Sequence, residues 1–258
     1  MQRTNKTSIT KRKAKTGSLT YVEDNTKIGN NVSIGPYTLI LSGAQIQDNC
    51  TIGSHCILAH PTKMQVQKAD FSSSSPKVAD LIVEKPMTKI SRDSVIRSGS
   101  TIYKHVIAGE RLRTGHNALI REHSTLGNHC VIGTNVIIDG YIKVGDGSMV
   151  QSNSYVAQSV RIGRGVFIAP GCVFMDNKSM VMGRGLQGAL IEDYVRIGGA
   201  TKILPGVTIG KHALIGAGSV ISKNVPPKAV AYGVPAKVRR VQSEKDIKRY
   251  IDSVVNWE

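Results

Sequence analysis

Residues 114–138 read TGHNALIREHSTLGNHCVIGTNVII, and an aliphatic or small residue returns at every sixth position of this stretch. The same phase continues on both sides, without a slip, over residues 90–174. A second compact side chain stands two residues before most members of the row, and glycine often follows them. An internal repeat this regular is the signature of a repeat architecture. The row consists of Ile90, Ile96, Ile102, Ala108, Thr114, Ile120, Leu126, Ile132, Ile138, Val144, Val150, Val156, Ile162, Ile168 and Phe174.

A period of six fits neither an α-helix nor the simple alternation of a long strand. It requires very short strands that turn one face inward, each followed by a sharp bend, for which glycine is suited. Three such strands close a triangular coil, and stacked coils bury one continuous core. The pattern therefore predicts a parallel β-solenoid whose interior is filled by the aliphatic row and the small row before it.

This pattern resembles the hexapeptide-repeat family, and the handedness follows from that resemblance alone. It implies an all-β fold, a left-handed parallel β-helix (hexapeptide repeats), to which the rest of the sequence adds two loop excursions and a short C-terminal α-helix. Only 5% of the residues are aromatic, which fits a coil too narrow for large rings. A purely structural solenoid that carries no site is the alternative.

The breaks in the period predict how the chain is organised. Residues 1–20 are polar and basic, and we expect a flexible arm there. The β-helix is expected over residues 21–242. Its period fails over residues 59–84 and 175–190, which we interpret as excursions from the coil, because the repeat resumes after each one.

The last residues, 243–258, predict an amphipathic helix that caps the open end of the solenoid. Ile247 and Ile251 have the spacing of one helical face, and Ser243 with Asp246 three residues later is typical of a helix start. Consecutive prolines before this segment end the strand ladder.

The chain has 258 residues, with 34 Lys and Arg against 18 Asp and Glu, a net charge of +16. This excess favours an anionic partner. We expect a polyphosphate small molecule such as coenzyme A or a nucleotide sugar, and no nucleic acid, because no helix-turn-helix or aromatic-rich module is visible. A scaffold or nucleic-acid binder remains the alternative that charge alone suggests.

Apolar runs stay well short of the ~18–20 residues of a membrane span, and the basic N-terminus has no apolar segment of a secretory signal. The four cysteines fall largely at inward positions, where they act as small core residues of a reducing compartment. We therefore expect a cytoplasmic protein without a membrane span. The cysteines are Cys50, Cys56, Cys130 and Cys172.

Residues 197–238, IGGATKILPGVTIGKHALIGAGSVISKNVPPKAVAYGVPAKV, strongly resemble the C-terminal coils of hexapeptide acyltransferases that use coenzyme A. With TGHNALIREH (114–123) and QSNSYV (151–156), the chain looks closest to the enzymes that acylate the amino group of dTDP- or UDP-linked amino sugars. The resemblance covers about residues 20–240. It implies transfer of an acetyl or short acyl group from acyl-coenzyme A, in a homotrimer with sites between subunits.

This reaction needs a base for the attacking group and a donor for the oxyanion. Histidine suits the base role near neutral pH, and His116 is the first candidate because it follows the Gly115 bend and should point outward. Asn117 and Glu122 are near enough in sequence to orient it, and His123 is the second candidate. Alternatively, the amine loses its proton to the departing thiolate, and His116 only positions the substrate.

The resemblance also implies the substrate-binding residues. Asn153 matches a position where an asparagine contacts the amino group of the sugar; a polar corner residue, or an asparagine stacked along one coil edge, is the alternative. Asp176 and Asn177 match residues that lie beside the substrate. Arg164 stands where many relatives have an acidic residue, so the resemblance does not determine the exact substrate.

For coenzyme A, the family uses backbone groups in a slot between neighbouring coils, together with basic side chains for the phosphates. Each basic residue taken singly also fits a solvated surface. The matching residues are Gly199, Ala200, Lys202, Gly216, Ala217, Lys223, Lys237 and Arg239.

Two enzyme classes compete with this interpretation. Zinc carbonic anhydrases share the coil but need three converging histidines, including a pair five residues apart, whereas His116, His123 and His129 are spaced by seven and six. We therefore expect no metal. An O-acyltransferase acting on a sugar or serine hydroxyl shares the coenzyme A segments, and the sequence does not separate it from an N-acyltransferase.

Overall fold

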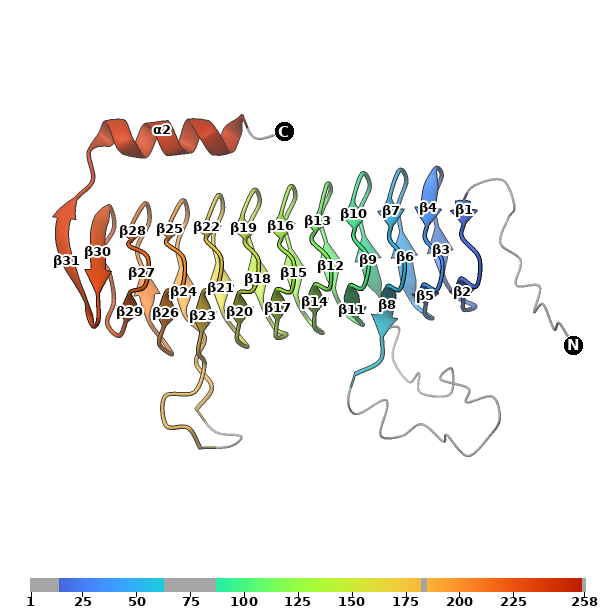
Figure 1. The fold of residues 1–258 in the computed structure, drawn as a ribbon, viewed down its shortest axis with the longest axis horizontal. Helices are drawn as coiled ribbons and strands as arrows, with labels where there is room; N and C mark the ends of the chain where they lie inside the picture. The colour runs from blue at the N-terminus through green and yellow to red at the C-terminus, as the bar shows by residue number, and fades with distance from the viewer. Residues whose placement is uncertain (1–13, 63–86, 182–184, 257–258) are drawn as a thin grey trace, which may run out of the picture.

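The computed structural model describes residues 14–62, 87–181 and 185–256. Figure 1 shows a stack of triangular coils that runs the length of the molecule, with α2 (Glu244–Val255) lying along one side of the stack. Each coil gives one short strand to each of three sheets, so each strand from β1 to β26 pairs with the third strand after it. At the C-terminal end, β28 pairs with β30, and β30 pairs antiparallel with β31. This is the architecture of the predicted left-handed parallel β-helix.

We name the three sheets A, B and C in the order in which the chain meets them. They contain 12, 10 and 9 strands. Sheet A consists of β1 (Ala14–Thr16), β4 (Val32–Ile34), β7 (Thr51–Ile52), β10 (Val95–Ile96), β13 (Arg113–Thr114), β16 (Val131–Ile132), β19 (Met149–Val150), β22 (Phe167–Ile168), β25 (Arg196–Ile197), β28 (Leu214–Ile215), β30 (Ala229–Gly233) and β31 (Ala236–Val241). Sheet B consists of β2 (Tyr21–Val22), β5 (Leu39–Ile40), β8 (Ile57–His60), β11 (Thr101–Tyr103), β14 (Leu119–Ile120), β17 (Ile137–Ile138), β20 (Tyr155–Val156), β23 (Val173–Phe174), β26 (Lys202–Ile203) and β29 (Val220–Ile221). Sheet C consists of β3 (Lys27–Ile28), β6 (Ala44–Ile46), β9 (Thr88–Ile90), β12 (Ile107–Ala108), β15 (Thr125–Leu126), β18 (Lys143–Val144), β21 (Arg161–Ile162), β24 (Leu190–Ile191) and β27 (Thr208–Ile209).

The pairing register places the sixfold row inside the coil. Thr114 pairs with Ile132, and Ile132 with Val150, so like positions stack at a step of eighteen residues. Their side chains are buried, and Ile120, Ile132 and Val150 have no exposed surface. The predicted core is therefore confirmed.

The corners between the sheets are tight because one residue in each takes a left-handed conformation. We name them the A–B, B–C and C–A corners after the sheets they join. At the A–B corner, Asn117, Asn135 and Asn153 have φ angles of 55°, 56° and 60°. Asparagine tolerates this region better than other residues with a Cβ, so the repeated asparagines fit the bend.

The β-helix starts earlier than the sequence predicted. β1 pairs with β4, so residues 14–16 belong to sheet A and not to a flexible arm ending at residue 20. The remaining arm residues, 1–13, lie outside the described residues.

Both predicted excursions leave the coil at the B–C corner. The first lies between β8 and β9, and its residues 63–84 are outside the described ranges. β8 extends to His60, so the first two residues of the predicted excursion, 59 and 60, belong to sheet B. The second opens after β23 and ends where β24 begins at Leu190.

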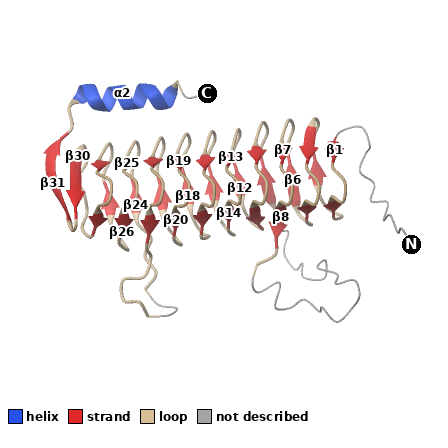
Figure 2. Cartoon of the chain, in the orientation of Figure 1, coloured by secondary structure: helices blue, strands red, loops and turns tan. Residues whose placement is uncertain are grey.

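The terminal helix has the predicted start but a different position. Ser243 Oγ accepts a hydrogen bond from the backbone N–H of Asp246 at 3.2 Å, as expected for an N-cap. However, α2 does not cap the open end. The β30–β31 hairpin extends sheet A there, and α2 turns back along the coils, where the Tyr250 hydroxyl donates to Gly165 O at 2.8 Å. α2 is the one helix among the described residues, and Figure 2 shows it in blue beside the strands of the coil.

The four cysteines are buried and unpaired, as predicted. Within the described ranges, no helix is long and apolar enough to span a membrane.

The inward and outward positions of one strand can be separated by mutation. We expect Ile96→Ala, at a fully buried position of β10, to lower the free energy of unfolding by about 2–5 kcal/mol, because it leaves a cavity in the coil. Val95→Ala, at the neighbouring position that is 36% exposed, should lower the free energy of unfolding clearly less. Urea-unfolding midpoints measure both. Equal losses would contradict the register.

Candidate active site

The A–B corner collects residues from distant parts of the sequence. We call the corner residues that one coil contributes a rung. Backbone hydrogen bonds connect successive rungs: Asn135 N donates to His116 O at 2.9 Å, and Gly218 N donates to Gly199 O at 2.8 Å. His116 and Gly199 hold the same corner position, four strands apart along sheet A. At the strand spacing of ~4.8 Å, about 19 Å separates them. Seven predicted site residues share this corner: His116, Asn117, Asn153, Gly199, Ala200, Gly216 and Ala217.

The His116 side chain is exposed, and its backbone N–H donates to Thr134 Oγ1 at 3.2 Å. Among the described residues, its imidazole makes no hydrogen bond. The predicted orienting role of Glu122 is not seen: this residue lies at the other end of β14, at the B–C corner, and both its oxygens accept from Arg121. A free, exposed imidazole can accept a proton from a bound substrate.

His123 belongs to an aromatic stack at the B–C corner. Its ring lies between those of His105 and Tyr141, with centroid distances of 4.7 Å on each side. The eighteen-residue step produces this stack, since the three residues hold the same corner position. His123 therefore faces a different edge of sheet B from His116.

The asparagines of the A–B corner form a ladder. Asn135 Nδ2 donates to Asn153 Oδ1 at 3.2 Å, so the stacked-asparagine interpretation of Asn153 is confirmed. The Nδ2 group of Asn153 has no partner among the described residues and remains able to donate to a ligand. Asn117 occupies the rung before Asn135, beside His116.

The rungs near the end of the coil have almost no side chains. Gly198, Gly199 and Ala200 form one rung, and Ala217 and Gly218 belong to the next. A Cβ atom on Gly198 would lie 2.4 Å from the backbone N of Ala217, so only glycine allows these coils to approach. Ala200, Ala217 and Gly218 are exposed, and the peptide groups of this edge are accessible to a ligand.

The predicted basic residues separate into two pairs. Lys202 on β26 and Lys223 after β29 are exposed around sheet B, on the coils of the glycine rungs. Lys237 and Arg239 lie on β31, in the hairpin that extends sheet A. The Arg239 guanidinium lies 5.2 Å from the ring centroid of Tyr232.

Sheet B carries a polar cluster that the sequence analysis did not predict. Arg121 Nη1 lies 2.6 Å from Asp139 Oδ1, and the Tyr155 hydroxyl donates to Asp139 Oδ2 at 2.6 Å. Burial, with the bond to Asp139 next, raises the pKa of Tyr155, and the charge of Asp176 adds to the effect. Arg121 and Asp139 are eighteen residues apart. A comparison of residues one coil apart in the sequence would therefore have predicted that they are neighbours.

The two residues that open the second excursion differ in role. Asn177 shapes the excursion: its Nδ2 donates to Val181 O at 2.8 Å, and its Oδ1 accepts from Ser179. Asp176 lies closer to the polar cluster, where its charge acts on Tyr155. Its carboxylate has no hydrogen-bond partner in the described part of the chain.

Arg164 lies away from these residues, at the C–A corner. Its Nη2 lies 3.2 Å from Asp193 Oδ2, and this pairing lowers the pKa of Asp193 against the opposite effect of burial. The described ranges contain no group of three or more His, Cys, Asp or Glu side chains that could hold a metal ion.

The chain matches the family model "Bacterial transferase hexapeptide (six repeats)" over residues 25–62, 141–175 and 188–223. It is 45% identical over 60 residues to a galactoside O-acetyltransferase of Lactococcus lactis, and 48% identical over 56 residues to one of Escherichia coli. These matches cover 23% and 22% of the chain, and only 29% and 28% of those enzymes, so the chain spans less than a third of their length.

Among solved structures, the Arabidopsis UDP-N-acetylglucosamine acyltransferase aligns with a TM-score of 0.52 at 20% identity. The alignment covers 89% of this chain and 74% of that one. At this identity, the likeness concerns the fold alone.

The polar cluster on sheet B should behave as a coupled unit. We expect Arg121→Gln to lower the free energy of unfolding by about 1–3 kcal/mol, because two largely buried carboxylates lose their donor. In a double-mutant cycle with Asp139→Asn, the double variant should lose less than the sum of the singles. The exposed pair Arg92–Glu110 is the matched control and should show almost no coupling. If the losses in free energy of the two single variants simply added in the double variant, Arg121 and Asp139 would not be coupled.

Proposed function

The chain belongs to the hexapeptide-repeat transferase family, and from this premise we propose that it transfers an acetyl or short acyl group from acyl-coenzyme A to a sugar. One observation carries the proposal. The exposed imidazole of His116, the Asn153 amide and the glycine rungs at Gly199 and Ala217 lie along a single corner of the coil. A catalytic base, a polar anchor and an accessible backbone edge are what acyl transfer from a long, thin donor requires.

The reaction proceeds in two steps. The acceptor attacks the thioester carbonyl, a bond forms to carbon, and His116 removes the proton from the attacking group. The C–S bond then breaks, and the coenzyme A thiolate leaves and takes up a proton. About 19 Å separates His116 from the Gly199 rung, so the donor lies extended along the corner. In the proposed homotrimer, a neighbouring subunit forms the second wall of the site.

The proposed acceptor is the amino group of a dTDP- or UDP-linked amino sugar. Asn153 has an unused amide donor for the sugar. Asp176, whose carboxylate has no hydrogen-bond partner among the described residues, supplies negative charge beside Tyr155 of sheet B that attracts an ammonium group before it loses its proton. The exposed Lys202 and Lys223 suit the phosphates of the donor.

Acylation of a hydroxyl is the second candidate. The local identity to two galactoside O-acetyltransferases favours it. A hydroxyl needs a base more than an amine does, and the free imidazole of His116 could supply one.

Thiol release from acetyl-coenzyme A tests the proposal. We expect release with at least one member of a panel of dTDP- and UDP-amino sugars, and none with the matched hydroxyl sugars. Release with hydroxyl sugars alone would establish the second candidate. If the protein did not bind coenzyme A at all, acyl transfer would be excluded.

The role of His116 can be measured on the substrate found in this way. His116→Ala should lower kcat by 10²–10⁴-fold with little change in KM, as expected for loss of a general base. His129→Ala, at the exposed C–A corner of the same coil, is the control and should retain activity. A loss below about tenfold at His116 would mean that the amine's proton leaves with the thiolate.

A further inference from the structure

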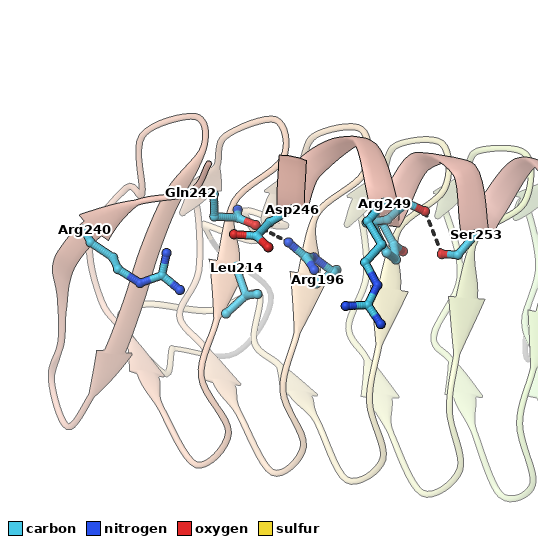
Figure 3. A pocket seen from close by; sticks show the side chains of 8 residues that line it. Arg196, Leu214, Arg240, Gln242, Asp246, Arg249 and Ser253 are labelled. Atoms are coloured by element: carbon cyan, nitrogen blue, oxygen red, sulfur yellow. Dashed lines mark hydrogen bonds between the residues drawn. The ribbon is translucent and has the colours of Figure 1, made fainter. Parts of the chain in front are cut away.

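A pocket of about 360 Å³ lies between α2 and the outer face of sheet A. One face of α2 forms its cover, and the ends of β25, β28 and β31 form its floor (Figure 3). It is separate from the A–B corner, although it uses the coils that carry the glycine rungs. The lining residues are Arg196, Leu214, Arg240, Gln242, Asp246, Arg249, Tyr250 and Ser253.

Three guanidinium groups converge on this pocket from three elements. Arg196 comes from β25, Arg240 from β31 and Arg249 from α2, and Figure 3 shows Arg249 reaching from the helix toward the sheet. In the described part of the chain, none of the three forms an ion pair with a carboxylate. Asp246 is the one acid of the lining, and its carboxylate already accepts a hydrogen bond from Ser243 Oγ at 2.7 Å. The pocket therefore has an excess of about two positive charges.

Arg196 is held rigidly and incompletely satisfied. Its Nη2 donates to Gln242 Oε1, and its guanidinium lies 4.9 Å from the ring centroid of Tyr250. Gln242 is fixed in turn, because its Nε2 donates to His212 O. The Nε group of Arg196 is buried and has no partner among the described residues. A buried donor without an acceptor costs free energy, and the uncompensated guanidinium charge beside it would be offset by an anion in the pocket.

We propose that this pocket binds a diphosphate group. Guanidinium forks match phosphate oxygens in geometry as well as charge, and three of them around one hollow suit a ligand with several negative charges. The stacking of Arg196 on Tyr250 fixes one fork before the ligand arrives, which lowers the ordering cost of binding. The proposal is independent of acyl transfer, because free pyrophosphate is a sufficient ligand.

Two sources could supply the diphosphate: coenzyme A and a nucleotide-linked sugar. Arg196 and Leu214 precede Gly199 and Ala217 by three residues each, so the pocket and the glycine rungs lie at opposite ends of the same two strands. A coenzyme A bound at the rungs, or an acceptor nucleotide reaching across sheet A, meets the pocket.

Isothermal titration of the full chain with sodium pyrophosphate, at low ionic strength, tests the site. We expect one site per chain, with binding weakened by added salt and at least tenfold by Arg196→Gln or Arg249→Gln. The Arg249 variant changes a surface position of α2, so its effect is not confused with misfolding. Arg113→Gln, an exposed arginine of sheet A outside the pocket, is the control and should bind like the unaltered protein. The absence of pyrophosphate binding, or unchanged binding by both pocket variants, would overturn the proposal.

Competition identifies the source. Displacement of pyrophosphate by coenzyme A but not by UDP or dTDP would assign the pocket to the acyl donor, and the reverse result to the acceptor nucleotide. If neither displaces it while the arginine variants still weaken binding, the pocket is a diphosphate site separate from both substrates. Failure of the acyl-transfer proposal would appear in the thiol assay and would leave this titration unchanged.

Discussion

The backbone hydrogen bonds between successive coils are the constraint on which the rest of this structure depends. Leu119 N donates to Val136 O at 2.9 Å, and Ile137 N donates to Ser154 O at 3.1 Å. Because this ladder repeats in parallel at a step of eighteen residues, each outward side chain stands directly above the one a coil earlier. The surface is therefore made of columns, and any site must be built along a column or between two. The asparagine ladder and the glycine rungs belong to one such column at the A–B corner, and the His–Tyr stack forms another at the B–C corner.

The sequence alone was sufficient to predict the buried core of the coil. Burial of Ile120 or Ile132 depends only on a local six-residue period, and a left-handed corner such as that at Asn135 needs only a suitable residue in the bend. The helix start at Ser243 is equally local, since the cap bond spans three residues. Each of these features is encoded within one repeat, so no knowledge of distant contacts was needed to predict it.

Features that depend on contacts between coils were harder to predict. Glu122 is close to His116 in sequence, but a two-residue strand carries the chain from one corner to the next, and Arg121 binds its carboxylate. The pair Arg121–Asp139 becomes visible only at the eighteen-residue step, and Tyr155 joins it from the neighbouring strand, sixteen residues from Asp139. The direction of α2 depends on the β30–β31 hairpin, a tertiary feature that the amphipathic pattern does not contain. Seven of the predicted site residues thus share a corner, whereas Glu122, one of the two residues predicted to orient His116, lies at another corner.

A repeating coil presents convex corners and flat faces, so its own symmetry gives it few enclosed pockets. The structure departs from that symmetry at the excursions of the B–C corner and in the C-terminal segment. By folding back over sheet A, α2 covers one side of an open hollow that Arg249 of the helix lines together with Arg196 and Arg240 of the sheet (Figure 3). Part of the net charge of +16 is thereby gathered around one hollow, where Gln242 and Tyr250 hold Arg196 in place. Charge held in this way selects for the shape of an anion, which a diffuse basic surface cannot do.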